Sequence, residues 1–242
     1  MTTRFLVVGL PRSGTTYLMS LLNAHPKVRC DGEIFNPNSL IMQGAPQQDD
    51  ARILTRDTFP KAFLEKHFIR QTEEDPKALA VGSKYMIGHH PEVYDFLRAR
   101  PDIRLIYVYR ENKLAQTASL LKALQTKKWA TRNPLSVDRT PIPAWPRNVA
   151  MRVREQQTTD LLFQNFLAGM PNPSVTFEYR EMFQPGFKDS LCQFLDVPSS
   201  RRMKSWLVKQ GDNNILARFE HSKAIAEYFT AIGKGDWLEP EL

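Results

Sequence analysis

The stretch FLVVGLPRSGTTYLMSLLNAHP, residues 5–26, passes from an apolar run through a glycine-bearing turn into helix-forming sequence. Residues 5–9 form a short apolar run that is typical of a buried strand. From Gly14 to Ala24 the apolar residues recur at helical spacing, and His25-Pro26 ends the predicted helix. A strand, a glycine-bearing loop and a helix in this order predict a loop that binds phosphate.

The rest of the chain continues the alternation of strands and helices. Strands are predicted near residues 28–30, 78–82, 102–110 and 173–178. Helices are predicted near residues 57–70, 91–100, 113–128, 147–168 and 181–195, followed by a helical C-terminal part. Residues 36–56 and 130–146 are polar or rich in proline, and they predict two long loops. This alternation predicts an α/β fold with a doubly wound parallel sheet flanked by helices, in which ligands bind at the carboxyl ends of the strands.

Composition limits the class of protein. A chain of 242 residues fits one domain, residues 1–242. The formal net charge of +7 is compatible with an ordinary solvated surface or with attraction of an anionic ligand. No nucleic-acid motif is visible and the basic residues are dispersed, so we expect no nucleic-acid partner.

Two features predict the compartment. Two cysteines do not make a disulfide framework, which favours a reducing environment. The apolar run of residues 5–10 is too short for a signal peptide or a transmembrane helix, and no other stretch is long enough to span a bilayer. We therefore expect a cytoplasmic protein.

The loop G-L-P-R-S-G-T-T, residues 9–16, has the spacing of a phosphate loop, except that Thr15 stands where a nucleotide hydrolase has lysine. Backbone N–H groups of residues 12–16 are expected to face an anion, and the hydroxyls of this segment add hydrogen bonds. The strand at 102–110 ends in Arg110, where a magnesium-binding carboxylate would be expected in an ATPase. Both departures disfavour triphosphate hydrolysis. Arg12 is instead suited to neutralising charge on a departing phosphate.

Three segments carry a family resemblance: PRSGTTYL, LLNAHP and GEIFN. They resemble the PAPS-dependent sulfotransferases, closest to the bacterial carbohydrate and Nod-factor type. The resemblance extends to VYRENKLAQTASLLKA, residues 108–123, and to the strand–helix unit at 174–198. It implies the P-loop-like sulfotransferase fold and metal-independent, in-line transfer of a sulfuryl group from PAPS to an acceptor hydroxyl. The product would be adenosine 3′,5′-bisphosphate, and no metal site is expected.

The resemblance also implies roles for individual residues. The 5′-phosphosulfate would be held by Arg12, Ser13, Gly14, Thr15 and Thr16, and the 3′-phosphate by Arg110 and Ser119. Lys84 matches a lysine that the family directs towards the sulfate. Two departures occur beside Arg110. Ser119 follows the arginine by nine residues instead of the eight of the animal enzymes, and Glu111 stands where bacterial relatives often carry a second basic residue.

Sulfuryl transfer needs a base near the acceptor oxygen. Glu33 in CDGEIFN matches the glutamate that serves as base in the bacterial enzymes. His89 and His90 in GSKYMIGHH are the rivals, because animal enzymes use a histidine after a comparable strand. We prefer Glu33 because it follows the second predicted strand, as in the bacterial type, and we keep both histidines as candidates.

Two other functions remain open at this level. A small-molecule kinase would share the fold, but it predicts magnesium dependence and a lysine in the loop. A non-catalytic module that binds a polyanion would use the positive net charge. The expected partner of the transferase is a hydroxyl-bearing acceptor, a glycan or glycolipid, framed by the loops 36–56 and 130–146. Trp129 and Trp145 are candidates to stack on a sugar ring, and the oligomeric state is not predicted.

Overall fold

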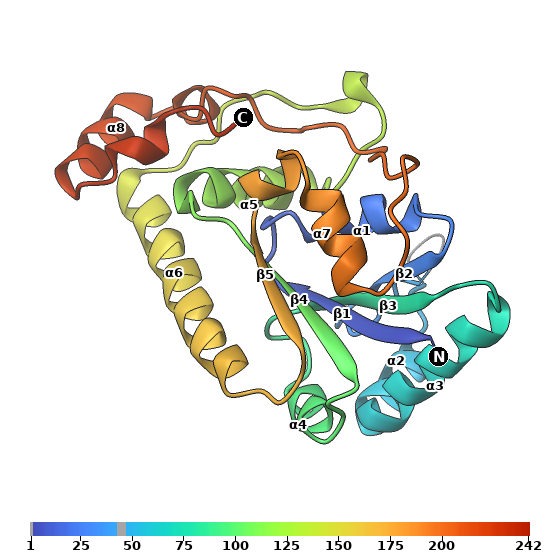
Figure 1. The fold of residues 1–242 in the computed structure, drawn as a ribbon. Coiled ribbons are helices and arrows are strands. Elements are labelled where there is room, and N and C mark those ends of the chain that lie inside the picture. The colour runs from blue at the N-terminus through green and yellow to red at the C-terminus, as the bar shows by residue number, and fades with distance from the viewer. Residues whose placement is uncertain (1, 43–46) are drawn as a thin grey trace.

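In the computed structural model, which describes residues 2–42 and 47–242, five parallel strands form one sheet in the order β2-β3-β1-β4-β5. The strands are β1 (Thr3–Gly9), β2 (Val28–Glu33), β3 (Ala80–Met86), β4 (Ile103–Tyr109) and β5 (Ser174–Glu178). Figure 1 shows the sheet at the centre of the molecule with helices on both sides. The predicted doubly wound α/β fold is therefore confirmed.

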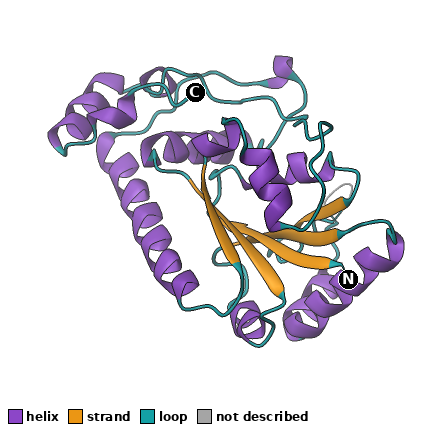
Figure 2. Cartoon of the chain, in the orientation of Figure 1, coloured by secondary structure: helices purple, strands orange, loops and turns teal. Residues whose placement is uncertain are grey.

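The helices of the described chain lie on the two faces and at one end of the sheet (Figure 2). They are α1 (Thr15–Asn23), α2 (Asp50–Thr58), α3 (Pro60–Glu74), α4 (Glu92–Arg98), α5 (Lys113–Thr126), α6 (Pro146–Ala168), α7 (Phe187–Phe194) and α8 (Ser222–Ala231). Short 3₁₀ turns are η1 (Pro134–Ser136), η2 (Arg180–Phe183), η3 (Leu216–Arg218) and η4 (Gly235–Leu238). Each of these helices is too short or too polar to cross a lipid bilayer.

The alternation of side chains along β1 explains the two covered faces. Phe5 and Val7 point into one core cluster, which includes residues of α1 and α7. Leu6 and Val8 point into the opposite cluster, with residues of α3, α4 and α6. Because both faces of a parallel strand are buried, the strand reads as a continuous apolar run. A third cluster joins α5 and α6 to α8 and η4, with Phe229 and Trp237 at its centre.

The strand order sets where a ligand can bind. The chain leaves β1 towards β2 on one side of the sheet and leaves β4 towards β5 on the other side. The loops after these adjacent strands therefore open a crevice at the carboxyl edge of the sheet. A guanidinium nitrogen of Arg110, directly after β4, donates to the backbone carbonyl of Arg12 in the loop after β1, at 3.3 Å.

Three predictions of secondary structure were wrong in part. Residues 50–56 of the expected loop belong to α2, which begins where the side chain of Asp49 accepts a hydrogen bond from the backbone N–H of Arg52; residues 43–46 of that loop lie outside the described residues. The helix expected at 181–195 is divided into η2 and α7, because Pro185 and Gly186 intervene and Gly186 has a φ of 86°. Residues 204–210 run without helix across the molecule, although a helical C-terminal part was expected.

Candidate active site

The loop after β1 is compact and left-handed at two residues. Gly9 admits no side chain, since a Cβ there would lie 2.6 Å from the carbonyl oxygen of Val108. Arg12 has a φ of 68° and Gly14 a φ of 107°. Such conformations turn successive backbone N–H groups towards one point, and helix α1 begins directly afterwards. Ser13 is completely buried, and among the described residues its hydroxyl has no hydrogen-bond partner. The loop thus has the geometry of an anion site.

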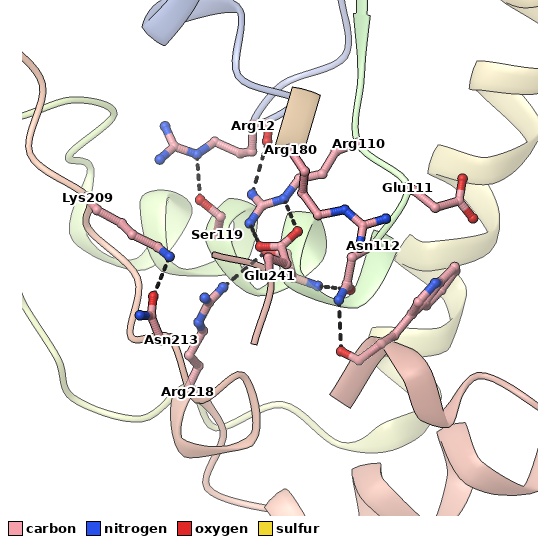
Figure 3. Close-up of polar contacts among 12 residues, drawn as sticks. Arg12, Arg110, Glu111, Asn112, Ser119, Arg180, Lys209, Asn213, Arg218 and Glu241 are labelled. Atoms are coloured by element: carbon pink, nitrogen blue, oxygen red, sulfur yellow. Dashed lines mark hydrogen bonds and ion pairs between the residues drawn. The ribbon is translucent and has the colours of Figure 1, made fainter. Parts of the chain in front are cut away.

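Arg110 lies on one side of this loop, where β4 ends (Figure 3). Its Nε donates to Oε1 of Glu241 at 2.8 Å, and a second guanidinium nitrogen contacts Oε2 of the same carboxylate. The guanidinium also lies over the ring of Tyr179, 4.4 Å from the ring centroid. Arg110, which the sequence predicts to bind a phosphate, is therefore buried and paired with a carboxylate that is distant in sequence.

Ser119 is brought to the same place by α5. The helix begins at Lys113, and Asn112 is its N-cap, because its side chain accepts a hydrogen bond from the backbone N–H of Ala115. Arg12 Nε donates to Ser119 Oγ at 2.8 Å. The nine-residue separation from Arg110 thus still allows the hydroxyl to face the loop.

The Arg12 guanidinium has further partners in segments distant in sequence. It donates to the carbonyl oxygen of Trp129 at 2.5 Å and to Gln210 Oε1 at 3.2 Å. Burial and the neighbouring charge of Arg110 lower the pKa of Arg12 to about 10, so Arg12 remains a cation at neutral pH. The side chain of Arg12 thus points to the Ser119 side of the loop.

A cleft of about 190 Å³ connects these groups. Several residues that the sequence did not single out also line it, among them Tyr179, Phe183, Lys209 and Arg218. Burial and the charge of Arg110 lower the pKa of Arg218 to about 10. Lys209 and Arg218 belong to the stretch around η3 that carries no helical or strand periodicity, so no local signal marked them.

Glu33, Lys84 and Thr16 form the other side of the site. Glu33 and Lys84 are register partners on β2 and β3. Lys84 Nζ lies 3.0 Å from Glu33 Oε1 and donates to Thr16 Oγ1 at 2.8 Å. Asn36 Nδ2 donates to the other Glu33 oxygen at 2.9 Å. Lys84 therefore connects the candidate base directly to the phosphate loop.

The environment of Glu33 keeps it ionised. Burial alone raises the pKa of a carboxyl group, but the charge of Lys84 and the hydrogen bond from Asn36 outweigh burial and hold the pKa of Glu33 below its ordinary value. Glu33 is therefore an available proton acceptor at neutral pH. Thr15, by contrast, points its hydroxyl towards the sulfur of Met86, at 3.9 Å.

The two histidines differ in their surroundings. Burial lowers the pKa of His89, although the nearby charge of Glu33 opposes this shift. The charge of Glu33 thus contributes to the electrostatic environment of His89. The ring of His90 instead contacts α2, because its Nε2 lies 3.3 Å from the carbonyl oxygen of Asp57, and the backbone carbonyl of His90 accepts a hydrogen bond from Tyr85.

Residues 4–200 match a family model described as "Sulfotransferase family". Nodulation protein H of Rhizobium meliloti (strain 1021) is 33% identical over 129 residues, which are 52% of this chain and 49% of that protein. Nodulation protein H of Rhizobium tropici is 27% identical over 227 residues, which are 88% of this chain and 84% of that protein. The match thus spans about half the length of the first relative and most of the second.

Solved structures agree in fold. The sulfotransferase domain from the curacin biosynthetic pathway has a TM-score of 0.54 and 16% identity, and the match covers 93% of this chain and 83% of that domain. A sulfotransferase from Alicyclobacillus acidocaldarius has a TM-score of 0.52 and 17% identity, with 98% and 94% covered. At these identities the likeness concerns the fold alone. Because the family model covers most of the sequence, including the loop, Glu33, Lys84 and Arg110, the chain belongs to the sulfotransferase family.

Proposed function

We propose that this sulfotransferase moves a sulfuryl group from PAPS to a hydroxyl of a glycan or glycolipid acceptor. The observation that carries the proposal is the position of Lys84, which contacts both the candidate base Glu33 and Thr16 of the phosphate loop. Transfer to a hydroxyl requires a base near the acceptor oxygen and a site that stabilises the charge of the leaving phosphate. Lys84 joins the candidates for these two parts.

The described residues fit the nucleotide. The buried hydroxyl of Ser13 and the left-handed loop suit the 5′-phosphosulfate. On the other side, Arg110 has paired donors in the geometry that binds phosphate, and Ser119 lies beside the Arg12 guanidinium. The loop after β1 and the pair Arg110 and Ser119 provide two groups of anion-binding donors around one cleft, which supports a nucleotide with two separate phosphate groups.

PAPS supplies the activated sulfuryl group, joined to the 5′-phosphate. Glu33 accepts the proton of the acceptor hydroxyl, since its carboxylate is ionised at neutral pH. Lys84 orients that carboxylate and places a positive charge next to the loop. Arg12 and the loop N–H groups stabilise negative charge that develops on the 5′-phosphate.

The acceptor assignment rests on the likeness to the nodulation proteins and on the surroundings of Glu33. Residues 34–42 lie directly beside the base, and the backbone N–H of Ile41 donates to the Glu33 carbonyl at 3.4 Å. This side is the proposed entrance for the acceptor. Trp129 lines the cleft of about 190 Å³ that is proposed to hold the nucleotide, and the ring of Trp145 stacks on His221 with centroids 3.8 Å apart. The acceptor assignment does not rest on either tryptophan.

The test is transfer of radiolabelled sulfate from PAPS to panels of oligosaccharides and glycolipids. We expect labelled glycan, with adenosine 3′,5′-bisphosphate released in equal amount and activity retained in EDTA. Phosphorylated product that depends on ATP and magnesium would support the kinase alternative. Binding of sulfated or phosphorylated polymers without turnover would support the binding module.

A further inference from the structure

Arg56, on α2, is buried to 1% exposure, although arginine usually keeps its charge in water. One guanidinium nitrogen donates to the carbonyl oxygens of Ile34, at 3.0 Å, and Asn36, at 2.8 Å. Its Nε donates to Asp57 Oδ1 at 2.7 Å, and the group lies over the Phe35 ring. The buried cation thus holds the turn 34–36, which directly follows Glu33.

The turn 34–36 follows an irregular part of the sheet. The register between β2 and β3 shifts between Asp31 and Glu33, so Glu33 pairs with Lys84 only after an irregularity in the ladder. Gly32 is in close contact with the next segment, since a Cβ there would lie 2.6 Å from a side-chain carbon of Ile41. One oxygen of Glu33 is held by Lys84, and the other by Asn36. The residue that fixes Asn36 therefore influences the orientation of the carboxylate.

We propose that Arg56 is a positioning residue for the candidate base: it clamps the turn 34–36 so that the Asn36 amide holds Glu33 Oε2 for proton transfer. The inference rests on the proposed role of Glu33. Lysine at this position retains the charge, but its single nitrogen cannot bond the two carbonyls and also replace the separate Nε donor to Asp57, so Arg56→Lys separates geometry from charge. Arg52 on the same helix is exposed and bonded to Gln47, which makes Arg52→Lys the matched control.

The experiment measures kcat, the Kd for adenosine 3′,5′-bisphosphate and the Glu33 pKa, the last by NMR of labelled glutamate. Arg56→Lys is expected to lower kcat about 10-fold and to raise the Glu33 pKa, because the Asn36 hydrogen bond favours the ionised form. The nucleotide Kd should stay within about twofold, since Arg56 does not line the nucleotide cleft. Arg52→Lys should change none of the three.

A second variant guards against a folding defect. Asn36→Ala removes the amide itself, so Arg56→Lys combined with Asn36→Ala should be no slower than the slower single variant. Unchanged kcat and Glu33 pKa in Arg56→Lys, or a parallel loss of nucleotide binding, would overturn the inference. If the wild-type protein transfers no sulfuryl group, the proposed function is wrong, and the Glu33 pKa still decides whether Arg56 positions the carboxylate.

A different observation concerns Glu241, which occupies the guanidinium of Arg110. The two side chains point toward each other in Figure 3 and are 6% (Arg110) and 3% (Glu241) exposed. Leu242 lines the same cleft. The segment is anchored just before, because Trp237 is buried and its carbonyl accepts a hydrogen bond from Asn112 Nδ2 at 2.9 Å. An exchange of partners at Arg110 therefore requires movement of residues 239–242 only, and not of η4.

We infer that Glu241 is an internal competitor for the 3′-phosphate of the nucleotide. A carboxylate offers Arg110 the same two-oxygen geometry that a phosphate offers, and the buried arginine is never left without a partner. Nucleotide binding is then an exchange in which phosphate replaces carboxylate. The reverse exchange, in which Glu241 pairs with Arg110 again, helps the product to leave. This inference also rests on the proposed nucleotide.

Calorimetry of adenosine 3′,5′-bisphosphate and 5′-AMP tests the exchange. Glu241→Gln is expected to tighten binding of the bisphosphate about 10-fold, because the competing state is removed. Binding of 5′-AMP should gain less, since it leaves the Arg110 position unused. Glu239→Gln, an exposed control, should bind like wild type. Equal affinity in wild type and Glu241→Gln, or weaker binding in the variant, would overturn the inference, whereas no binding in either protein would contradict the proposed nucleotide.

Discussion

The two sides of the candidate site are assembled in different ways. Glu33 and Lys84 face each other because they are register partners on adjacent strands, so the sheet itself sets their contact. Arg12, Ser119 and Arg110 instead meet from a loop, a helix and a strand end, and Arg110 is paired with Glu241, 131 residues away. The proposed base thus lies on the side that the sheet holds, here called the rigid side, while the proposed 3′-phosphate contacts lie on the side where Glu241 is proposed to exchange for phosphate, here called the exchangeable side.

The largest expected effect tests the rigid side. Glu33→Ala should reduce kcat by about 10²-fold or more, the scale of general-base loss, while the Kd for adenosine 3′,5′-bisphosphate stays unchanged. Steady-state kinetics with calorimetry measures both. Normal turnover in Glu33→Ala, together with loss in His89→Ala or His90→Ala, would transfer the role of base to a histidine.

The next effect tests the exchangeable side. Arg110→Ala should weaken binding of adenosine 3′,5′-bisphosphate about 10²-fold, since charged hydrogen bonds to phosphate are lost, but should weaken binding of 5′-AMP far less. Because the substitution leaves Glu241 buried without its partner, the control is Arg110→Ala combined with Glu241→Gln. Equal weakening of both nucleotides would remove Arg110 from the 3′-phosphate position.

A smaller change is expected at Ser119. Ser119→Ala removes one neutral hydroxyl, so the Kd for the bisphosphate should rise about fivefold, consistent with a single hydrogen bond of about 1 kcal/mol. The kcat should remain near the wild-type value, because Ser119 lies on the nucleotide side. A loss confined to kcat would show that the two sides do not act separately.

The smallest effect concerns pH. A general base must be unprotonated, and the Glu33 pKa lies below its ordinary value, so kcat/KM should remain flat as pH falls from 8 to about 6. Its decline should begin only below the ordinary pKa of a glutamate. Stopped assays in buffers of constant ionic strength measure the profile. A decline near the pKa of free histidine would instead point to His89 or His90.

Much of the fold follows from local patterns. The buried run at 103–109 became β4, and Asn112 caps α5 as its side-chain chemistry predicts. The strands β2 and β3 are longer than expected, because pairing with a neighbour extends a strand beyond its apolar residues. Helix α2 was missed because its turns are mostly polar, and only Ile53 and Arg56 are buried. Sequence periodicity carries no information where a helix buries so little apolar surface.

The sequence by itself determined the strand, glycine-bearing loop and helix at residues 5–26, the order of strands and helices and the residues that match the family, because these depend on neighbours along the chain. Only the tertiary structure decided that Lys84 links Glu33 to the loop, that Arg56 holds the turn beside Glu33, and that Glu241 pairs with Arg110. Contacts between charged groups far apart in sequence leave no periodic pattern. They depend on which strand ends and loops the folded sheet brings to the same edge.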